Sequence, residues 1–319
     1  MRKVYIYPPF GGVNLYKKYI IDSFTENKDY IVTNHDGIGK AWLNLYKNFD
    51  ADMYLFSWPE SLCVSMFGFM RFIYISFYIG LFRLFKKKII WILHNKHPHN
   101  GDNWRTRFGM RLMARLSTII VTHSKDGIQY LENVLKVNKG YYIPHPVYST
   151  EIVPCKELEW DYIIWGTINS RKRILEFLEF IRERPYYKTK KILLCGRCPD
   201  LTYNNKIEKI VGNNVTYLNR FVSDDELREL ISKCKSILFT YLNDSVLSSG
   251  ALIYSLNFNK PIIGPNLGAF KDLDKIVSLY NDFDDIENID LKTNEDYIKD
   301  YIENNQWKDF PTKIENILF

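Results

Sequence analysis

The stretch ILFTYLNDSVLSSGALIYSLNFNKPIIGPNLGAF, residues 237–270, decides the fold. It begins with the apolar run 237–241, which is typical of a buried strand, and turns polar at 243–245. A helix is expected over 251–257, and residues 260–265 form a second buried run that ends in glycine and proline. Strand, loop, helix and strand in this order predict one βαβ unit of a parallel sheet.

The loop before this helix can bind an anion. Ser248, Ser249 and Gly250 stand at the expected helix start, and Ala251 is its first residue. The first backbone N–H groups of a helix have no partner inside it, and the helix dipole adds partial positive charge there. A phosphate or diphosphate fits this combination. The alternative is that the two serines only cap the helix.

Length and charge indicate two globular domains of different character. The chain has 319 residues, enough for two cores, and a net charge of +6. Residues 1–150 hold 20 Lys/Arg against 10 Asp/Glu, whereas residues 151–319 hold 23 against 27. The basic first half is expected to meet an anionic partner. Nucleic acid is not favoured, because the basic residues do not follow a recognisable binding module.

The cysteines and the N-terminus favour a cytoplasmic protein. Five scattered cysteines predict reduced thiols rather than disulfides. Cys195 and Cys198 have CxxC spacing, but no second pair follows at the distance of a zinc site, so no metal is expected. Residues 1–3 lead directly into a strand expected over 4–7, which is not the pattern of a cleavable signal.

Polar and aromatic residues follow the predicted strands of the first half. Strands are expected over 4–7, 30–32, 52–56, 88–93 and 118–122, separated by helical stretches, which predicts a parallel sheet. In open α/β sheets the carboxyl ends of the strands form the ligand crevice. The residues expected to gather there are Gly11, Gly12, Trp58, Glu60, His94, Asn95 and His123.

Residues 62–85 form the most hydrophobic stretch of the chain. Their length would suit a transmembrane helix, but Arg71, Arg83 and the strand patterns on both sides argue against a span. Two alternatives stay open. The stretch is either a buried crossover helix, or a helix with one face in the membrane interface, followed by the three lysines 86–88 for anionic headgroups.

The second half repeats the alternation of strands and helices. Residues 149–159 are polar and contain proline, which is typical of a hinge. The fold class predicted is α/β, with two Rossmann-like parallel-sheet domains facing each other across a cleft. The expected boundaries are 1–150 for an acceptor-binding domain and 151–305 for a donor-binding domain. A last helix, 306–319, is expected to pack across the domain junction.

Taken together, these residues resemble a glycosyltransferase of the GT-B architecture. Gly11-Gly12 resembles the Gly-Gly loop of glycogen-synthase-like transferases, and His94 resembles the strand-end histidine beside their donor sugar. The run from Gly166 to Lys172 resembles their Gly-x-Ile-x-x-x-Lys turn, whose cation holds the donor pyrophosphate. The resemblance implies a UDP- or GDP-linked sugar as donor and no other cofactor. The residues expected to bind it are Gly11, Gly12, Gly166, Thr167, Lys172, Arg173, Arg197, Arg220, Phe221, Ser248, Ser249, Gly250 and Ala251.

A closer resemblance is to bacterial polysaccharide transferases of the β-1,4-mannosyltransferase type. It is carried by Trp58-Pro59-Glu60, by Leu93-His94-Asn95 with Pro98-His99, and by Ser249-Gly250-Ala251-Leu252. One departure is clear. Retaining members of the architecture usually carry Glu-x7-Glu across the loop and helix of 237–270, where this chain has Val246 and Tyr254.

The resemblance implies transfer of a hexose to a glycan or lipid-linked acceptor in surface polysaccharide or capsule synthesis. An inverting, metal-independent reaction is favoured, in which Lys172 and Arg173 stabilise the leaving diphosphate. Glu60 is the expected base, with His94 as the alternative. Trp58, Asn95, His99 and His123 are expected at the substrate. The enzyme is expected in the cytoplasm, peripheral on the inner membrane face. The rival hypotheses are an inactive sugar-nucleotide-binding subunit and a GT-B epimerase, which would need dense carboxylates.

Overall fold

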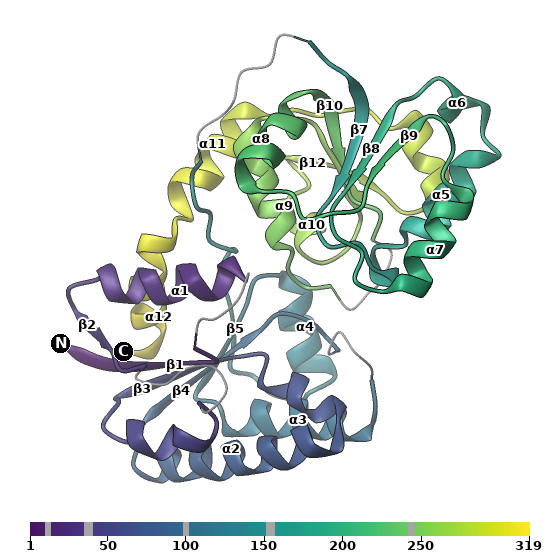
Figure 1. Cartoon of the computed structure of the whole chain (residues 1–319). Helices are drawn as coiled ribbons and strands as arrows, with labels where there is room; N and C mark the ends of the chain where they lie inside the picture. Colours follow the sequence, from purple (N-terminus) through teal and green to yellow (C-terminus); the bar gives the residue numbers. More distant parts are fainter. Residues whose placement is uncertain (10–13, 35–40, 98–101, 151–156, 242–245) are drawn as a thin grey trace. The chain divides into compact units, whose positions relative to one another are not determined.

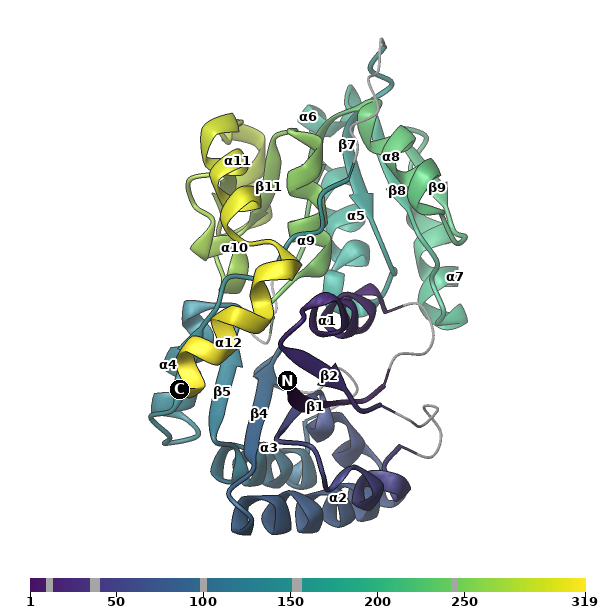
Figure 2. The same ribbon diagram turned by 90° about the vertical axis from the view of Figure 1, so that its left-hand side faces the viewer.

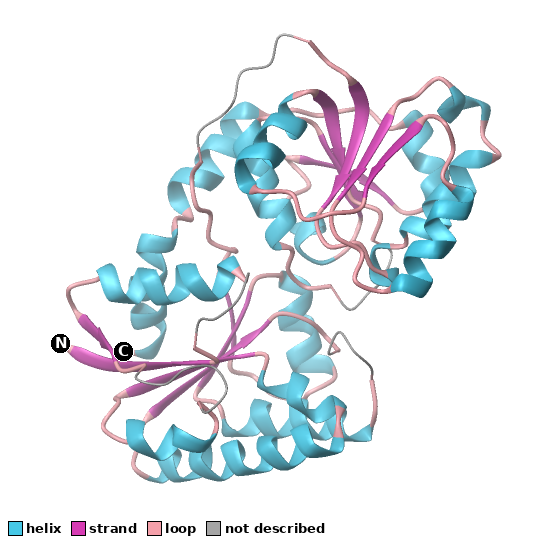
Figure 3. Cartoon of the chain, in the orientation of Figure 1, coloured by secondary structure: helices cyan, strands magenta, loops and turns pink. Residues whose placement is uncertain are grey.

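The computed structural model describes residues 1–9, 14–34, 41–97, 102–150, 157–241 and 246–319. The chain divides into two compact units (Figure 1). Unit 1 comprises Met1–Tyr148, Ser245–Ser248 and Asn305–Phe319, and unit 2 comprises Ser149–Asp244 and Ser249–Asn304. Each unit holds one six-stranded parallel sheet with helices on its faces, as the secondary-structure colouring of Figure 3 shows. The predicted fold class, two Rossmann-like α/β domains, is confirmed.

The sheet of unit 1 has the order β2-β1-β3-β4-β5-β6. Its strands are β1 (Arg2–Tyr7), β2 (Tyr30–Val32), β3 (Met53–Ser57), β4 (Lys88–Leu93), β5 (Ile119–Thr122) and β6 (Gly140–Tyr142). Its helices are α1 (Leu15–Glu26), α2 (Met66–Leu84), α3 (Trp104–Leu116), α4 (Lys125–Asn133) and α12 (Phe310–Leu318). Three short 3-10 helices, η1 (Leu43–Asn48), η2 (Pro59–Val64) and η6 (Trp307–Asp309), complete it.

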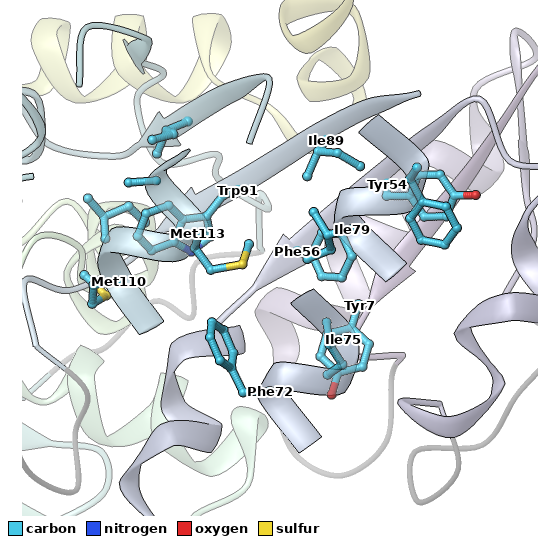
Figure 4. Packing of buried hydrophobic residues seen from close by; sticks show 14 of the residues in the cluster. Tyr7, Tyr54, Phe56, Phe72, Ile75, Ile79, Ile89, Trp91, Met110 and Met113 are labelled. Carbon is cyan, nitrogen blue, oxygen red and sulfur yellow. The ribbon is translucent and has the colours of Figure 1, made fainter. Parts of the chain in front are cut away.

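The register of unit 1 separates its side chains into two apolar layers. Tyr7, Phe56, Trp91 and Ile120 pair in one row across four strands, and all four lie in the core under α2, α3 and α4 (Figure 4). The row beside it, Ile6, Leu55, Ile90 and Ile119, belongs to the opposite core under α1 and α12. Because strand side chains alternate between the two faces, a sheet covered on both sides needs apolar residues at nearly every position.

The C-terminal helix completes unit 1. Helix α12 lies beside α1 in both views (Figures 1 and 2). Tyr30 donates a hydrogen bond of 3.1 Å to Glu315, which also forms an ion pair with Arg2. Phe310 and Ile314 are fully buried in the core under α1. The last segment of the chain is therefore packed against the first strand and the first helix.

The sheet of unit 2 has the order β12-β11-β10-β7-β8-β9. Its strands are β7 (Trp160–Trp165), β8 (Ile192–Cys195), β9 (Val215–Leu218), β10 (Cys234–Leu238), β11 (Ile262–Pro265) and β12 (Val277–Tyr280). Its helices are α5 (Ile174–Arg182), α6 (Pro185–Lys188), α7 (Leu201–Ile210), α8 (Asp224–Ser232), α9 (Gly250–Ser255), α10 (Gly268–Asp272) and α11 (Glu295–Asn304). The 3-10 helices are η3 (Ser170–Lys172), η4 (Leu256–Phe258) and η5 (Phe283–Asn288).

The stretch 237–270 forms the expected strand, helix and strand, with different boundaries. Strand β10 ends at Leu238 rather than at residue 241, and beyond it the Thr240 hydroxyl donates to the backbone oxygen of Lys172. Helix α9 begins at Gly250 and passes into η4 at Leu256. Between them, residues 246–248 belong to unit 1, where Leu247 is fully buried in the core.

Strands β7 and β8 end in a close approach that only glycine permits. Gly196 has φ +141°, and a Cβ added there would lie 2.3 Å from the backbone oxygen of Gly166. We expect Gly196→Ala to lower the free energy of unfolding by about 3 kcal/mol, because it combines backbone strain with a backbone clash. Urea-induced unfolding measures the change.

Gly80→Ala is the matched control for this substitution. An added Cβ at Gly80, inside α2, meets no atom within 4 Å. It should stabilise the chain by about 0.5–1 kcal/mol, because alanine restricts the unfolded state and suits a helix interior. Equal effects of the two substitutions would contradict the close approach at Gly196.

Candidate functional site

Six aromatic side chains gather at the carboxyl edge of the sheet in unit 1, namely Tyr16, Trp58, His94, His123, His145 and Trp307. Tyr16 of α1 lies at the centre of the group. Its ring centroid is 4.6 Å from that of His94, 5.3 Å from that of His145 and 5.0 Å from that of Trp307. His94 follows β4 and His145 follows β6, so parallel strands that end at one edge bring these rings together.

Hydrogen bonds fix the protonation of two of these histidines. His123, which follows β5, has Nδ1 2.8 Å from the carbonyl oxygen of Ile143. A carbonyl only accepts, so Nδ1 carries the proton, and Nε2 accepts from the Tyr16 hydroxyl at 2.8 Å. His145 likewise has Nδ1 2.9 Å from the Pro146 carbonyl. The chain thus holds Tyr16 as a donor to a fixed, neutral imidazole.

Burial keeps both imidazoles neutral. It lowers the pKa of His123 to about 3, helped by the neighbouring His145, and lowers the pKa of His145 to about 4. Burial also raises the pKa of Tyr16 well above its ordinary value. Tyr16, His123 and His145 are therefore uncharged hydrogen-bonding groups at neutral pH.

Trp58 is held in an unusual backbone conformation at the end of β3. Its φ of 55° and ψ of 30° lie in the left-handed region, which bulky residues seldom adopt. The indole stacks on His94 with 4.0 Å between ring centroids, and the Lys17 ammonium lies 5.7 Å from the indole centroid. Strained residues of this kind cluster at ligand sites. Trp58 is half-buried, whereas His94, on which it stacks, is 3% exposed.

Glu60 is almost fully buried in η2, with 2% of its surface exposed. It accepts a hydrogen bond of 3.3 Å from the Trp91 indole nitrogen. Burial is the main cause that raises the pKa of Glu60 to about 7. The structure therefore places Glu60 beside a core side chain, while Asn95 at the end of β4 is buried and pairs with Val246 in an isolated antiparallel bridge.

Unit 2 has its own strand-end site, at the switch point of the sheet. The chain leaves β7 toward β8 on one side and returns after β9 to β10 on the other side of β7. Ligands of open α/β sheets bind at this point. The segment after β7, Gly166 to Lys172, meets the segment after β10 here, through the bond from Thr240 to the Lys172 backbone.

Lys172 is the buried cation of this site. It is 8% exposed, and its Nζ donates a hydrogen bond of 2.6 Å to the carbonyl oxygen of Trp165, the last residue of β7. A Cβ added at Gly166 would lie 3.0 Å from Nζ. Burial, with a smaller contribution from neighbouring Arg171, lowers the pKa of Lys172 to about 7. An approaching anion would reverse this shift by favouring the charged form.

The other predicted donor residues of unit 2 surround the switch point less closely. Thr167 and Arg197 are exposed after β7 and β8. The backbone of Arg173 is left-handed, with φ 50°. Its Nε lies 3.9 Å from Oε1 of Glu176. Arg220 forms an ion pair with Glu226, and Phe221 is 69% exposed.

The loop before α9 contains a helix cap. The Ser249 hydroxyl accepts from the Leu252 backbone at 3.2 Å, so Ser249 is an N-cap. Gly250 and Ala251 are the first residues of α9, and an added Cβ at Gly250 meets no atom within 4 Å. Ser248 belongs to unit 1. Gly11, Gly12 and His99 lie outside the described residues.

Sequence reasoning missed three residues of these sites. Tyr16 lies inside a helix and Trp307 in the last segment, so neither follows a strand in the sequence. Thr240 was placed inside a strand. A tyrosine in the first turn of the first helix after a strand is a signal that could have pointed to Tyr16.

Comparisons with known proteins identify the fold. Sucrose-phosphate synthase from Thermosynechococcus elongatus superposes with a TM-score of 0.72 at 10% identity, covering 100% of this chain and 98% of that protein. Anabaena HepE, solved in complex with UDP-glucose, superposes with a TM-score of 0.59 at 12% identity. The match covers 97% of this chain and 92% of that protein. AviGT4, a glycosyltransferase of avilamycin A biosynthesis, superposes with a TM-score of 0.60 at 12% identity. The match covers 99% of this chain and 97% of that protein.

The chain has the GT-B fold. The likeness covers both units of the chain and nearly the whole of each of these three proteins. Neither a protein-family model nor a curated protein sequence matches the chain. In the described parts of this GT-B chain, no group of three or more His, Cys, Asp or Glu residues is arranged to hold a metal ion.

The buried imidazoles should make unit 1 sensitive to acid. The pKa of His145 is about 4 in the folded chain, against about 6.5 in an unfolded one, so the unfolded state binds more protons below pH 6.5. Stability is therefore lost as the pH falls from about 6.5 toward 4, by about 2 kcal/mol at pH 5 for each such imidazole. The raised pKa of Glu60 has the opposite effect on stability, because the folded state then binds more protons than the unfolded state as the pH falls.

A substitution separates these contributions. In His145→Asn, the loss of unfolding free energy between pH 6.5 and 5 should be about 2 kcal/mol smaller than in the native chain. His97→Asn, at an imidazole with 40% of its side chain exposed, is the control and should leave the loss unchanged. Urea titrations at the two pH values measure both. An unchanged loss in His145→Asn would show that His145 is protonated in the folded state.

Proposed function

We propose that the chain is a glycosyltransferase that moves a hexose from a nucleoside-diphosphate sugar to a glycan or lipid-linked acceptor. The observation that carries the proposal is the buried Lys172 at the switch point of a GT-B donor-type unit. A buried amine whose hydrogen bond goes to a neutral carbonyl, as that of Lys172 does, is costly unless an anion completes the site. A diphosphate leaving group supplies that anion and needs that charge during transfer.

The donor is a UDP-linked sugar. HepE, which shares the fold, is known with UDP-glucose and with UDP, which favours UDP over GDP here. Lys172 and Arg173 hold the diphosphate, with the turn that begins at Gly166 and Thr167. Arg197, Arg220 and Phe221, which follow the next two strands, border the nucleoside. The amides of Ser249, Gly250 and Ala251 add partial positive charge.

The acceptor binds to unit 1 on the surface of Trp58, His94, Asn95 and His123. Aromatic faces and fixed, neutral hydrogen-bonding groups suit a sugar ring, which is uncharged and has apolar faces. Trp58 stacks on the sugar, and the Tyr16–His123 pair fixes the position of the neighbouring His94 ring.

Transfer is inverting and needs no metal ion. The acceptor oxygen attacks the anomeric carbon, the bond to the diphosphate breaks, and UDP leaves with the electron pair. A base takes the acceptor proton. The pKa of Glu60, about 7, suits a base at neutral pH. Because the Glu60 carboxyl is buried beside Trp91, His94 at the strand end is the alternative base. Lys172 and Arg173 supply the positive charge that stabilises the departing diphosphate.

The biological role is surface polysaccharide or capsule synthesis at the cytoplasmic face of the cell membrane. A basic unit 1 suits a lipid-linked diphosphate acceptor. The alternative function is an inactive sugar-nucleotide-binding subunit. It is favoured by Tyr254, which packs against Trp165 at 5.6 Å between ring centroids where retaining relatives carry a carboxylate.

Replacing Lys172 tests the donor site. We expect Lys172→Met to weaken UDP binding at least about tenfold, because a charge-assisted hydrogen bond contributes about 1.5–3 kcal/mol. At pH 8 the native chain should also take up protons as UDP binds, since the pKa of Lys172 starts near 7 and the diphosphate raises it. Calorimetry in buffers of different ionisation enthalpy measures the affinity and the proton uptake together.

Lys206→Met, at an exposed position of α7, is the matched control. It should bind UDP as the native chain does, with the same proton uptake. Unchanged UDP affinity in Lys172→Met would place the diphosphate elsewhere.

Release of UDP from UDP-sugars tests the reaction. With a lipid-linked glycan fraction as acceptor and EDTA present, the native chain should release UDP in proportion to the acceptor. Glu60→Gln should lower kcat about 100-fold, without changing UDP affinity, if Glu60 is the base. His94→Asn is assayed beside it as the alternative base. UDP binding without sugar transfer from any UDP- or GDP-sugar would favour the inactive subunit.

A further inference from the structure

One stripe of α2 is apolar and exposed along the whole helix. Its members are Met66, Met70, Ile73, Phe77 and Leu84, which are 59%, 64%, 42%, 62% and 78% exposed. Their spacing of three, four and seven residues places them on one face of the helix. The outward face of a helix on a water-soluble domain is ordinarily polar. This stripe holds no polar residue, so water is an unfavourable partner for it.

The opposite face of α2 is part of the core. Phe72, Ile75, Ile79 and Phe82 are fully buried against the sheet, in the cluster that includes Trp91 (Figure 4). Within the described residues, α2 is also the one helix long and apolar enough to cross a membrane, judged by length and composition. Crossing would remove these side chains from the core. The packing therefore favours a helix that lies on a membrane over one that spans it.

Neighbouring elements widen the apolar stripe into a patch. Trp104 and Phe108 of α3 are 64% and 43% exposed, and both contact Phe69 of α2, with centroid distances of 5.5 Å and 5.9 Å. Phe67 and Phe85, near the two ends of α2, are also exposed. Helices α2 and α3 lie side by side on the outer layer of unit 1 in both views (Figures 1 and 2). Contiguous exposed patches of this kind mark interaction sites.

Cations surround this patch and carboxylates are almost missing from its sequence. Residues 61–125 hold eleven Lys/Arg and one Asp/Glu, Asp102. Arg83 and Lys86 are exposed at the end of α2, and Arg111 and Arg115 are exposed on α3. An apolar strip bordered by Lys and Arg is the pattern of helices that lie in the headgroup region of an anionic bilayer.

The same charges disfavour a second copy as the partner. In a two-fold dimer the same patch faces itself, so the cationic borders of both copies would meet. Like charges brought together in this way cost free energy, and the acidic residues needed to offset them are lacking from 61–125 apart from Asp102. An anionic lipid surface is complementary to both the apolar and the cationic parts.

We propose that the outer face of α2 and α3, bordered by Arg83, Lys86, Arg111 and Arg115, docks unit 1 onto an anionic lipid bilayer. The apolar stripe enters the region between headgroups and acyl chains, and the cations bind the headgroups. The choice of a membrane rests in part on the proposed function, in which the acceptor is lipid-linked. Docking would bring the acceptor site of unit 1 to the surface where such acceptors reside.

Vesicle binding tests the apolar contribution. The full chain should sediment with vesicles of mixed phosphatidylcholine and phosphatidylglycerol. Met70→Ser/Phe77→Ser should bind them at least about tenfold more weakly, because both side chains lose the apolar surface they bury in the bilayer. The matched control is Leu201→Ser/Leu291→Ser, at two exposed leucines of unit 2, which should bind as the native chain does. Equal weakening in both double variants would overturn the proposal.

The electrostatic contribution has its own variant. Arg111→Gln/Arg115→Gln should weaken binding to the anionic vesicles about tenfold, and the native chain should bind them less at high salt. Lys206→Gln/Lys209→Gln, which removes the same charge from exposed positions of α7, is the control. Equal binding of the native chain to pure phosphatidylcholine vesicles would contradict an anionic partner.

Two further measurements separate the possible failures. Light scattering reports the oligomeric state, and a dimer that Met70→Ser/Phe77→Ser converts to a monomer, without vesicle binding by the native chain, would overturn the proposal in favour of a second copy. Thermal unfolding with UDP is recorded on the same samples. If UDP stabilises the native chain while vesicles do not bind it, the membrane inference fails and the proposed donor site stands. If vesicles bind but UDP does not, the docking surface stands and the proposed function fails.

Discussion

The buried amine of Lys172 is the constraint from which the function follows. It donates to the last carbonyl of β7 at 2.6 Å, at the point where the direction of the sheet's connections reverses. This contact satisfies one of three ammonium donors with a neutral partner, and burial lowers the pKa of Lys172 to about 7. The site is thus prepared for an anion. The GT-B fold, the glycine pair at the ends of β7 and β8, and Thr240 all serve to hold this amine in place.

Unit 1 differs from unit 2, because its strand ends hold neutral groups rather than a buried amine. Tyr16, His123 and His145 are fixed by hydrogen bonds to one another or to backbone carbonyls, and burial keeps both imidazoles uncharged. A surface of this kind binds by shape and by hydrogen bonds rather than by charge. Four exposed cations of unit 1, Arg83, Lys86, Arg111 and Arg115, lie on or next to α2 and α3. In the proposed function, the charged site of unit 2 would bind the donor and the uncharged groups of unit 1 would bind the acceptor.

Much of this organisation could be predicted from the sequence. The alternation of apolar runs predicted both sheets, because parallel strands covered on both faces must be apolar throughout. Strand-end positions pointed to Trp58 and His94, since the residue after a strand lies at the ligand edge whatever the tertiary packing, and the resemblance of the turn that begins at Gly166 pointed to Lys172. Tyr16 and Trp307 could not be predicted, because their places depend on how α1 and the last segment pack on the sheet. The burial of Glu60 is also a tertiary property, set by the contact of η2 with Trp91.

The most direct measurement of the central claim is a crystal structure of the full chain with UDP bound. The account predicts that the diphosphate oxygens lie within hydrogen-bond distance of the Lys172 ammonium, beside the turn that begins at Gly166. The ammonium should then have exchanged part of its contact with Trp165 for the diphosphate. UDP bound away from the switch point of unit 2, with the Lys172 ammonium still on the Trp165 carbonyl alone, would contradict it.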